Sequence, residues 1–275
     1  MKTVAIVGTG LIGSSFGLAL RAAGFRGEIV GVSSPRALEA AVACRAIDRG
    51  AALAEAVADA DLVFLSQTIG RILDTVRHLD PLLKPGALVT DAGSTKCEIV
   101  DVARQCISRA QFLGGHPMAG KESRGAEAAD PALFRGKTWV LTPDEAAELE
   151  TPAVRAFRNW LDRLGARQVV LDADEHDRIV AGTSHLPQLA STALAAVLSA
   201  VPHPEVSGSG LLDMTRLALS SYDLWRDILA TNSDHIDKAL AEYVQELEHI
   251  RENLRTRQLQ QEFERAAELA KRLRP

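Results

Sequence analysis

A glycine-rich segment near the start of the chain has the spacing of a dinucleotide-binding loop. Six consecutive residues form the pattern G-x-G-x-x-G between an apolar run and a helix-like segment: Gly8, Thr9, Gly10, Leu11, Ile12 and Gly13. Such glycines permit a tight turn, close approach of the backbone to a pyrophosphate, and packing of helix against strand. The free N–H groups at the helix start favour the phosphates. The segment therefore predicts a dinucleotide site, the alternative being a purely structural turn.

The residues that follow the second apolar run bear on which dinucleotide binds. A carboxylate at this position would accept a hydrogen bond from the ribose 2′-hydroxyl of NAD. Here Ser33 and Ser34 follow the run and Arg36 comes shortly after, so two hydroxyls and a guanidinium are available to a 2′-phosphate. These residues favour NADP over NAD. The alternative is that Arg36 is simply solvated at the start of the next helix.

Two segments that follow later apolar runs carry side chains able to move a proton. His116 lies in residues 114–120, G-G-H-P-M-A-G, where the flanking glycines would let substrate and cofactor approach. Ser94 and Lys96 lie in residues 91–96, D-A-G-S-T-K. We expect an acid/base role for His116. Ser94 would bond His116 or the substrate, or cap the next helix, and Lys96 would lie near cofactor or substrate, or face solvent.

Two further motifs lie in the last third of the chain. Residues 184–188, S-H-L-P-Q, contain His185 and Gln188, and residues 213–216, D-M-T-R, contain Arg216. A guanidinium is a natural partner for a carboxylate substrate. By themselves, both motifs are explained by a structural role as well as by substrate binding.

Short apolar runs alternate with helix-like segments over the first two-thirds of the chain. Strands are predicted at 4–7, 28–32, 62–65, 87–90, 111–113, 138–141 and 168–171. Helices are predicted at 11–23, 35–44, 69–79, 97–108 and 151–164. Because unbroken apolar runs suit strands covered on both faces, this pattern predicts an α/β fold with a Rossmann-type, doubly wound, mostly parallel sheet.

From about residue 172 the pattern changes to helices alone. We therefore predict a dinucleotide-binding domain over 1–172 and a helical domain over 173–275. In the last long helix one stripe repeats every 3.5 residues: Ile236, Leu240, Tyr243, Leu247, Ile250 and Leu254. This stripe is explained either by packing within its own domain or by contact with a second subunit.

The composition limits the class of protein. Hydrophobic residues make up 47% and charged residues 24% of the chain, which is ordinary for a globular protein. A net charge of −5 offers no basic excess for nucleic acid. Three cysteines without a C-x-x-C motif predict free thiols in a reducing cytoplasm. Residues 4–20 are uncharged but contain four glycines, so they predict a strand and a helix rather than a signal peptide or membrane span.

Together the motifs resemble those of the prephenate/arogenate (cyclohexadienyl) dehydrogenase family. The resemblance is carried by residues 8–13, 91–96, 114–120 with Glu122, 184–188, 213–216 and 224–228, in the family's order. It implies a Rossmann domain followed by a helical dimerisation domain, with the substrate between them, in a homodimer. It also implies NAD(P)-dependent oxidative decarboxylation of prephenate to 4-hydroxyphenylpyruvate in tyrosine biosynthesis, with no metal because the nicotinamide accepts the hydride.

The resemblance also implies a role for each motif residue. His116 would bond the substrate hydroxyl and take its proton, and Ser94 would orient the pair. Arg216 would bind a substrate carboxylate, while His185 and Gln188 would line the pocket. Gln188 stands where some prephenate-using members have a second histidine, so arogenate and dual specificity stay open beside prephenate.

Two remoter alternatives remain at this point. A β-hydroxyacid dehydrogenase or imine reductase would need a lysine in the helical domain, where only Lys238 precedes the C-terminal tail. A non-enzymatic NADP-sensing protein would need no catalytic histidine.

Overall fold

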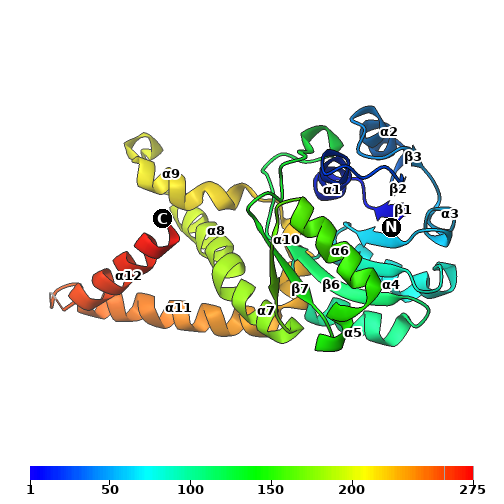
Figure 1. Cartoon of the computed structure of the whole chain (residues 1–275). Coiled ribbons are helices and arrows are strands. Elements are labelled where there is room, and N and C mark those ends of the chain that lie inside the picture. The colour runs from blue at the N-terminus through cyan, green and yellow to red at the C-terminus, as the bar shows by residue number, and fades with distance from the viewer. Residues whose placement is uncertain (257, 275) are drawn as a thin grey trace.

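One eight-stranded sheet organises the first two-thirds of the chain (Figure 1). The computed structural model describes residues 1–256 and 258–274, so residues 257 and 275 of the predicted helical domain lie outside the described part. The strands are β1 (Thr3–Val7), β2 (Glu28–Val32), β3 (Arg49–Gly50), β4 (Leu62–Leu65), β5 (Leu88–Asp91), β6 (Gln111–Pro117), β7 (Thr138–Thr142) and β8 (Arg167–Val170). Their order is β3-β2-β1-β4-β5-β6-β7-β8, and β6 and β7 pair antiparallel while the other neighbours are parallel. The predicted Rossmann-type, mostly parallel sheet is confirmed.

Helices connect the strands and cover both faces of the sheet. They are α1 (Leu11–Ala22), α2 (Pro35–Ala43), α3 (Leu53–Ala58), α4 (Ile69–Leu79), α5 (Cys97–Cys106) and α6 (Pro152–Arg163). The sequence analysis missed β3 and α3, because a two-residue exposed strand and a six-residue helix are too short to show a hydrophobic period.

The side chains of β1 show how the two faces are built. Val4 and Ile6 point into a cluster that packs α1, α2 and α6 against one face. Ala5 and Val7 point into the cluster of the other face, which contains α3, α4 and α5. The first cluster is rich in aromatic side chains at close contact: Phe16, Phe64, Phe134, Trp139 and Phe157. Burial on both faces explains why the strands lack polar alternation.

Strand β6 continues further than the sequence predicted. We expected a strand at 111–113 and a loop from 114, but β6 runs to Pro117, and His116 pairs with Val140 of β7. A side chain at Gly114 would collide with Thr142 of β7, so these glycines admit the neighbouring strand rather than a ligand. A glycine-rich strand carries no apolar pattern, which is why it was interpreted as a loop.

After β8 the described residues form helices and turns without a strand, as predicted. The helices are α7 (Ala173–Val180), α8 (Leu186–Leu198), α9 (Ser209–Thr215), α10 (Tyr222–Thr231), α11 (Ser233–Asn253) and α12 (Gln260–Leu273), with a π-helical turn (Ala181–His185) joining α7 to α8. Helix α10 returns to the sheet, where Ile228 is buried against the α4 side. Helices α8, α11 and α12 extend away from the sheet (Figure 1). No helix in the described ranges is both long and apolar enough to cross a membrane.

Candidate active site

A cavity of about 730 Å³ lies at the carboxyl edge of the sheet and is closed on one side by the helical segment. Six of the predicted site residues line it: Gly10, Leu11, Ile12, Ser94, His116 and His185. Trp225 and Ile228 of α10 and the loop 118–125 complete much of the wall. The fold thus brings together motifs from both halves of the chain.

The glycine-rich loop has the geometry of a pyrophosphate site. Helix α1 begins after Gly10, and no side chain caps its first N–H groups, which leaves them for an anion. A methyl group at Gly13 would collide with the Gly8 carbonyl oxygen and Ser66 Oγ, whereas one at Gly10 would meet nothing within 4 Å. Gly13 therefore permits the packing of helix on strand, and Gly10 leaves space in front of the helix. Thr9, also predicted for this site, is buried behind the loop. These residues fit a dinucleotide.

The end of β2 lies beside this loop, because Gly8 N–H donates to the Val32 carbonyl at 2.8 Å. Ser33, Ser34 and Arg36 follow in exposed positions, with Arg36 in the first turn of α2. The structure therefore places two hydroxyls and a guanidinium, and no carboxylate, directly after β2.

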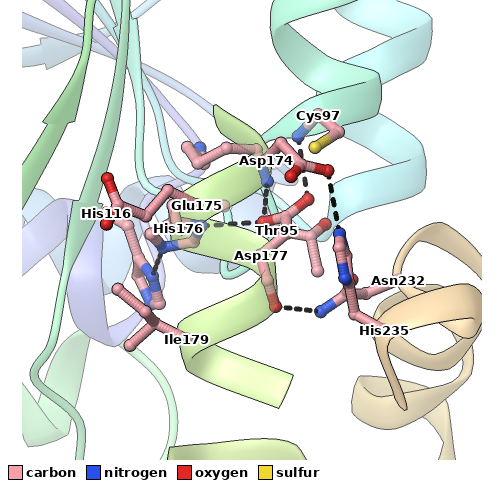
Figure 2. Close-up of polar contacts among 12 residues, drawn as sticks. Thr95, Cys97, His116, Asp174, Glu175, His176, Asp177, Ile179, Asn232 and His235 are labelled. Atoms are coloured by element: carbon pink, nitrogen blue, oxygen red, sulfur yellow. Dashed lines mark hydrogen bonds and ion pairs between the residues drawn. The ribbon is translucent and has the colours of Figure 1, made fainter. Parts of the chain in front are cut away.

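His116 is part of a chain of polar contacts that reaches into the helical segment (Figure 2). Its Nδ1 lies 2.8 Å from Nε2 of His176, and Nδ1 of His176 lies 2.7 Å from Oδ1 of Asp177. Burial, together with the neighbouring His176 and Lys96, holds the pKa of His116 well below its ordinary value. His116 is therefore neutral at pH 7 and can accept a proton.

Asp177 also anchors the start of helix α5. Its Oδ1 accepts the N–H of Lys96 at 2.7 Å, and its Oδ2 accepts the N–H of Cys97 at 2.9 Å. Burial alone would raise the pKa of the Asp177 carboxyl, but the hydrogen bonds from His176, Cys97 and Lys96 hold it below its ordinary value. The carboxylate is thus ionised and caps α5 from another helix. Ser94 does not cap α5, whose N-cap is Lys96.

Lys96 does not face solvent, which was one of the two positions expected for it, and it is not among the residues that line the cavity. Its side chain is fully buried, forms an ion pair with Asp91 and donates to the Gly115 carbonyl at 2.8 Å. Asp91 in turn accepts the N–H groups of Gly93 and Gly115. A buried carboxylate at the end of β5 requires a cation, and Lys96 supplies it. This placement favours a structural role over substrate binding.

His185 lies on the wall opposite the loops of the sheet. Its ring packs edge-on against Trp225 at 5.8 Å between centroids, and Asn232 Nδ2 donates to its Nδ1 at 3.2 Å. Burial, with a further contribution from His176, lowers the pKa of His185 to about 4. The ring is therefore neutral at pH 7, like that of His116.

Gln188 and Arg216 are not among the residues that line the cavity. Gln188 is buried and donates to the Leu217 carbonyl at 2.8 Å. Arg216 is exposed and lies 3.1 Å from Oε1 of Glu122, in the loop that forms one wall of the cavity. Their roles in substrate binding stay predictions.

The sequence analysis did not single out His176 and Asp177. They lie 60 and 61 positions from His116 on a short helix, and only the acidic character of residues 173–177 marks that segment. Adjacent His and Asp residues on a helix do not by themselves indicate a catalytic role, because their contact with His116 of β6 depends on the tertiary structure.

Comparisons with known proteins agree with this arrangement. Residues 16–170 match the family model described as prephenate dehydrogenase, nucleotide-binding domain, and residues 172–272 match prephenate dehydrogenase, dimerization domain. The chain belongs to the prephenate dehydrogenase family. The resemblance drawn from the motifs is thereby confirmed, and the hydroxyacid dehydrogenase alternative loses its support.

Individual members of the family align over most of their length. The prephenate dehydrogenase of Lactococcus lactis is 34% identical over 258 residues, which cover 91% of this chain and 70% of that protein. The crystal structure of the Aquifex aeolicus prephenate dehydrogenase in complex with hydroxyphenyl propionate and NAD+ superposes with a TM-score of 0.89 at 30% identity, covering 99% of this chain and 98% of that one. The arogenate dehydrogenase of Synechocystis superposes with a TM-score of 0.81 at 31% identity, covering 100% and 99%.

Proposed function

We propose that this member of the prephenate dehydrogenase family catalyses the NAD(P)-dependent oxidative decarboxylation of prephenate to 4-hydroxyphenylpyruvate, a step of tyrosine biosynthesis. One observation supports this most directly: a neutral histidine, His116, lines the same cavity as the free N-terminus of α1. A hydride acceptor bound at that helix would lie beside a base able to take a hydroxyl proton.

The chain's own residues have distinct tasks in this reaction. Bound NAD(P)+ supplies the acceptor for the hydride that leaves the hydroxyl-bearing ring carbon of the substrate. His116 takes the proton from that hydroxyl at its cavity-facing nitrogen, and Ser94 orients the hydroxyl from the adjacent wall. The ring carboxylate then leaves as CO2, and its bonding electrons complete the aromatic ring. The phenolate oxygen that results takes the proton back from His116.

The substrate is proposed to be prephenate, with arogenate as the alternative. Arg216, in the loop-facing position beside Glu122, would bind a carboxylate, and His185 with Gln188 would contact the substrate side chain. Gln188 is neutral, and an acidic residue there would favour the ammonium group of arogenate. The superposition with an arogenate dehydrogenase keeps that substrate as the second candidate.

We further propose NADP as the preferred cofactor, because Ser33, Ser34 and Arg36 follow β2 without a carboxylate. The chain would act in the cytoplasm as a homodimer formed by its helical domain, with the domains dividing at residues 172 and 173. The description of the second family match as a dimerization domain supports the homodimer.

The direct test is the initial rate of reduced-nicotinamide formation with the four pairings of prephenate or arogenate and NAD or NADP. We expect the highest kcat/KM with prephenate and NADP, and a preference for NADP of at least about tenfold, equivalent to about 1.4 kcal/mol. A preference for NAD would contradict the role of Ser33 and Arg36. Absence of turnover in all four pairings would refute the proposed function.

His116→Asn separates an enzyme from a cofactor-sensing protein. Asparagine keeps a polar side chain but has no basic nitrogen, so we expect kcat to fall by about 10²–10⁴. NADP affinity, measured by calorimetry, should stay unchanged. A variant with wild-type turnover would exclude His116 as the base.

A further inference from the structure

We propose that His176 and Asp177 form a relay that fixes the tautomer of His116, so that its cavity-facing Nε2 carries no proton before the reaction. His176 is then a positioning residue: it does not line the cavity but decides whether His116 is a base. This inference rests on the proposed function of His116 and extends it to a residue of the helical segment.

The Asp177 carboxylate determines which group donates each hydrogen bond of the relay. An ionised Asp177 can only accept hydrogen bonds, and it accepts three, from Lys96 N–H, Cys97 N–H and Nδ1 of His176. The 2.7 Å contact with His176 therefore requires a proton on Nδ1 of His176. Figure 2 shows these contacts converging on the Asp177 side chain.

The positions of the protons on the two histidine rings follow from this first hydrogen bond. In the proposed relay His176 carries a single proton, on Nδ1, so its Nε2 presents a lone pair and accepts a hydrogen bond there. The donor 2.8 Å away is Nδ1–H of His116, and this proton leaves Nε2 of His116 unprotonated. The two rings meet at 72° with centroids 5.1 Å apart, an edge-on contact rather than a stack.

The other tautomer of His116 would present an N–H to the substrate. With the proton on Nε2, His116 would donate to the substrate hydroxyl and could not remove its proton. The relay therefore selects the tautomer that oxidation of an alcohol requires. A carboxylate that orients a catalytic histidine through its other ring nitrogen has the same effect in hydrolases.

The relay also prepares the site for the charge that the reaction creates. When His116 takes a proton at Nε2, its Nδ1–H becomes a stronger donor to His176, and the Asp177 carboxylate lies at the other end. Besides His176, the cations and rings near His116 are Lys96, which is neutralised by Asp91, and His185. Asp177 is thus the anion linked to His116 by hydrogen bonds.

Helix α7 is held firmly enough to position the relay. Asn232, which precedes α11, donates to the Asp177 carbonyl at 2.8 Å, while the Asp177 side chain holds the first turn of α5. The helical half of the chain therefore sets the tautomer of a histidine in the nucleotide-binding half.

Two substitutions at His176 separate hydrogen bonding from packing. In His176→Phe the ring fills the space but cannot accept the Nδ1–H of His116, and we expect kcat to fall about 100-fold. KM should change less than about threefold, because a residue outside the cavity contributes little to substrate binding. In His176→Gln the amide oxygen can accept this proton, and kcat should stay within about tenfold of wild type.

A spectroscopic readout tests the tautomer without turnover. In nitrogen-15 histidine-labelled wild-type protein at pH 7, the shifts of His116 should show a protonated Nδ1 and an unprotonated Nε2. In His176→Phe the two tautomers should both be populated. If His176→Phe does not fold, as judged by thermal unfolding, the wild-type spectrum and His176→Gln decide the question.

The control is His235→Phe. His235 contacts Asp174 of α7 at 3.0 Å, a comparable His–Asp pair that does not reach His116, so kcat and the His116 shifts should be unchanged. The relay is refuted if His176→Phe keeps wild-type kcat, if His176→Gln loses as much as His176→Phe, or if Nε2 of His116 is protonated. A wild-type protein without turnover would instead refute the proposed function and leave the spectroscopic result standing.

Discussion

At the residue scale, His116 and His185 are neutral because they are buried, and this burial makes the folded chain less stable at acidic pH. The pKa of His185 is lowered from 6.5 to about 4 in the folded chain, and burial is the main cause. Below pH 6.5 the unfolded chain therefore binds a proton that the folded chain does not. The stability contributed by the neutral ring is fully present above pH 6.5 and is lost as the pH falls towards 4.

We expect the free energy of unfolding to decrease by up to about 3 kcal/mol for this group across that window, at about 1.36 kcal/mol per pKa unit. Urea unfolding at several pH values between 7 and 4 measures it. His185→Gln keeps an acceptor for Asn232 but does not titrate, so its stability should depend less on pH than that of wild type. Equal pH dependence in the two proteins would contradict the lowered pKa.

At the scale of elements, two glycines near the start of helix α1 have different roles. A methyl group added at Gly13 would collide with the Gly8 carbonyl oxygen and with Ser66 Oγ, so it would push α1 away from β1. Gly10 lines the cavity with open space beside it. We expect Gly13→Ala to lower stability by about 1–3 kcal/mol through overpacking.

Gly10→Ala is the matched comparison. It should unfold at the wild-type temperature but bind NAD(P) at least about tenfold more weakly, because the methyl occupies space needed by the pyrophosphate. Thermal unfolding and cofactor titration of both variants test this. Unchanged cofactor binding in Gly10→Ala would place the dinucleotide elsewhere.

At the scale of the whole molecule, the helical segment after β8 exposes many large apolar side chains. Among the residues that the structure describes, eight large side chains of this segment are each exposed by two-thirds or more: Val197, Val206, Leu212, Leu219, Tyr222, Leu254, Phe263 and Leu273. The stripe of α11 is buried at Ile236 but exposed at Leu247 and Leu254. A second subunit would cover such a surface.

We therefore expect sedimentation at micromolar concentration to give twice the chain mass of 29.5 kDa. Phe263→Glu combined with Leu254→Glu should shift the protein towards the monomer, because two charges would be buried in the interface. Val42→Glu changes an exposed side chain on α2, in the other half of the chain, and should leave the mass unchanged. If the wild-type protein sediments as a monomer, the helical domain does not form a dimer interface.

The sequence by itself determined the features that depend on near neighbours. Apolar runs and glycine spacing predicted most of the strands and helices of the sheet and the glycine-rich loop, but not β3, α3 or the end of β6, because longer elements follow from backbone conformation and local periodicity. The position of Ser94 after one strand, and of His116 near the end of another, also placed them at the carboxyl edge of the sheet.

Only the tertiary structure decided which groups meet and which are buried. Lys96 was expected either near a ligand or facing solvent, and its partner Asp91 and the carbonyl of Gly115 hold it in the interior, away from solvent. His176 and Asp177 gain their meaning from His116, 60 positions away. Hydrogen bonding and desolvation act between residues that the fold brings together, and no local pattern in the sequence carries that information.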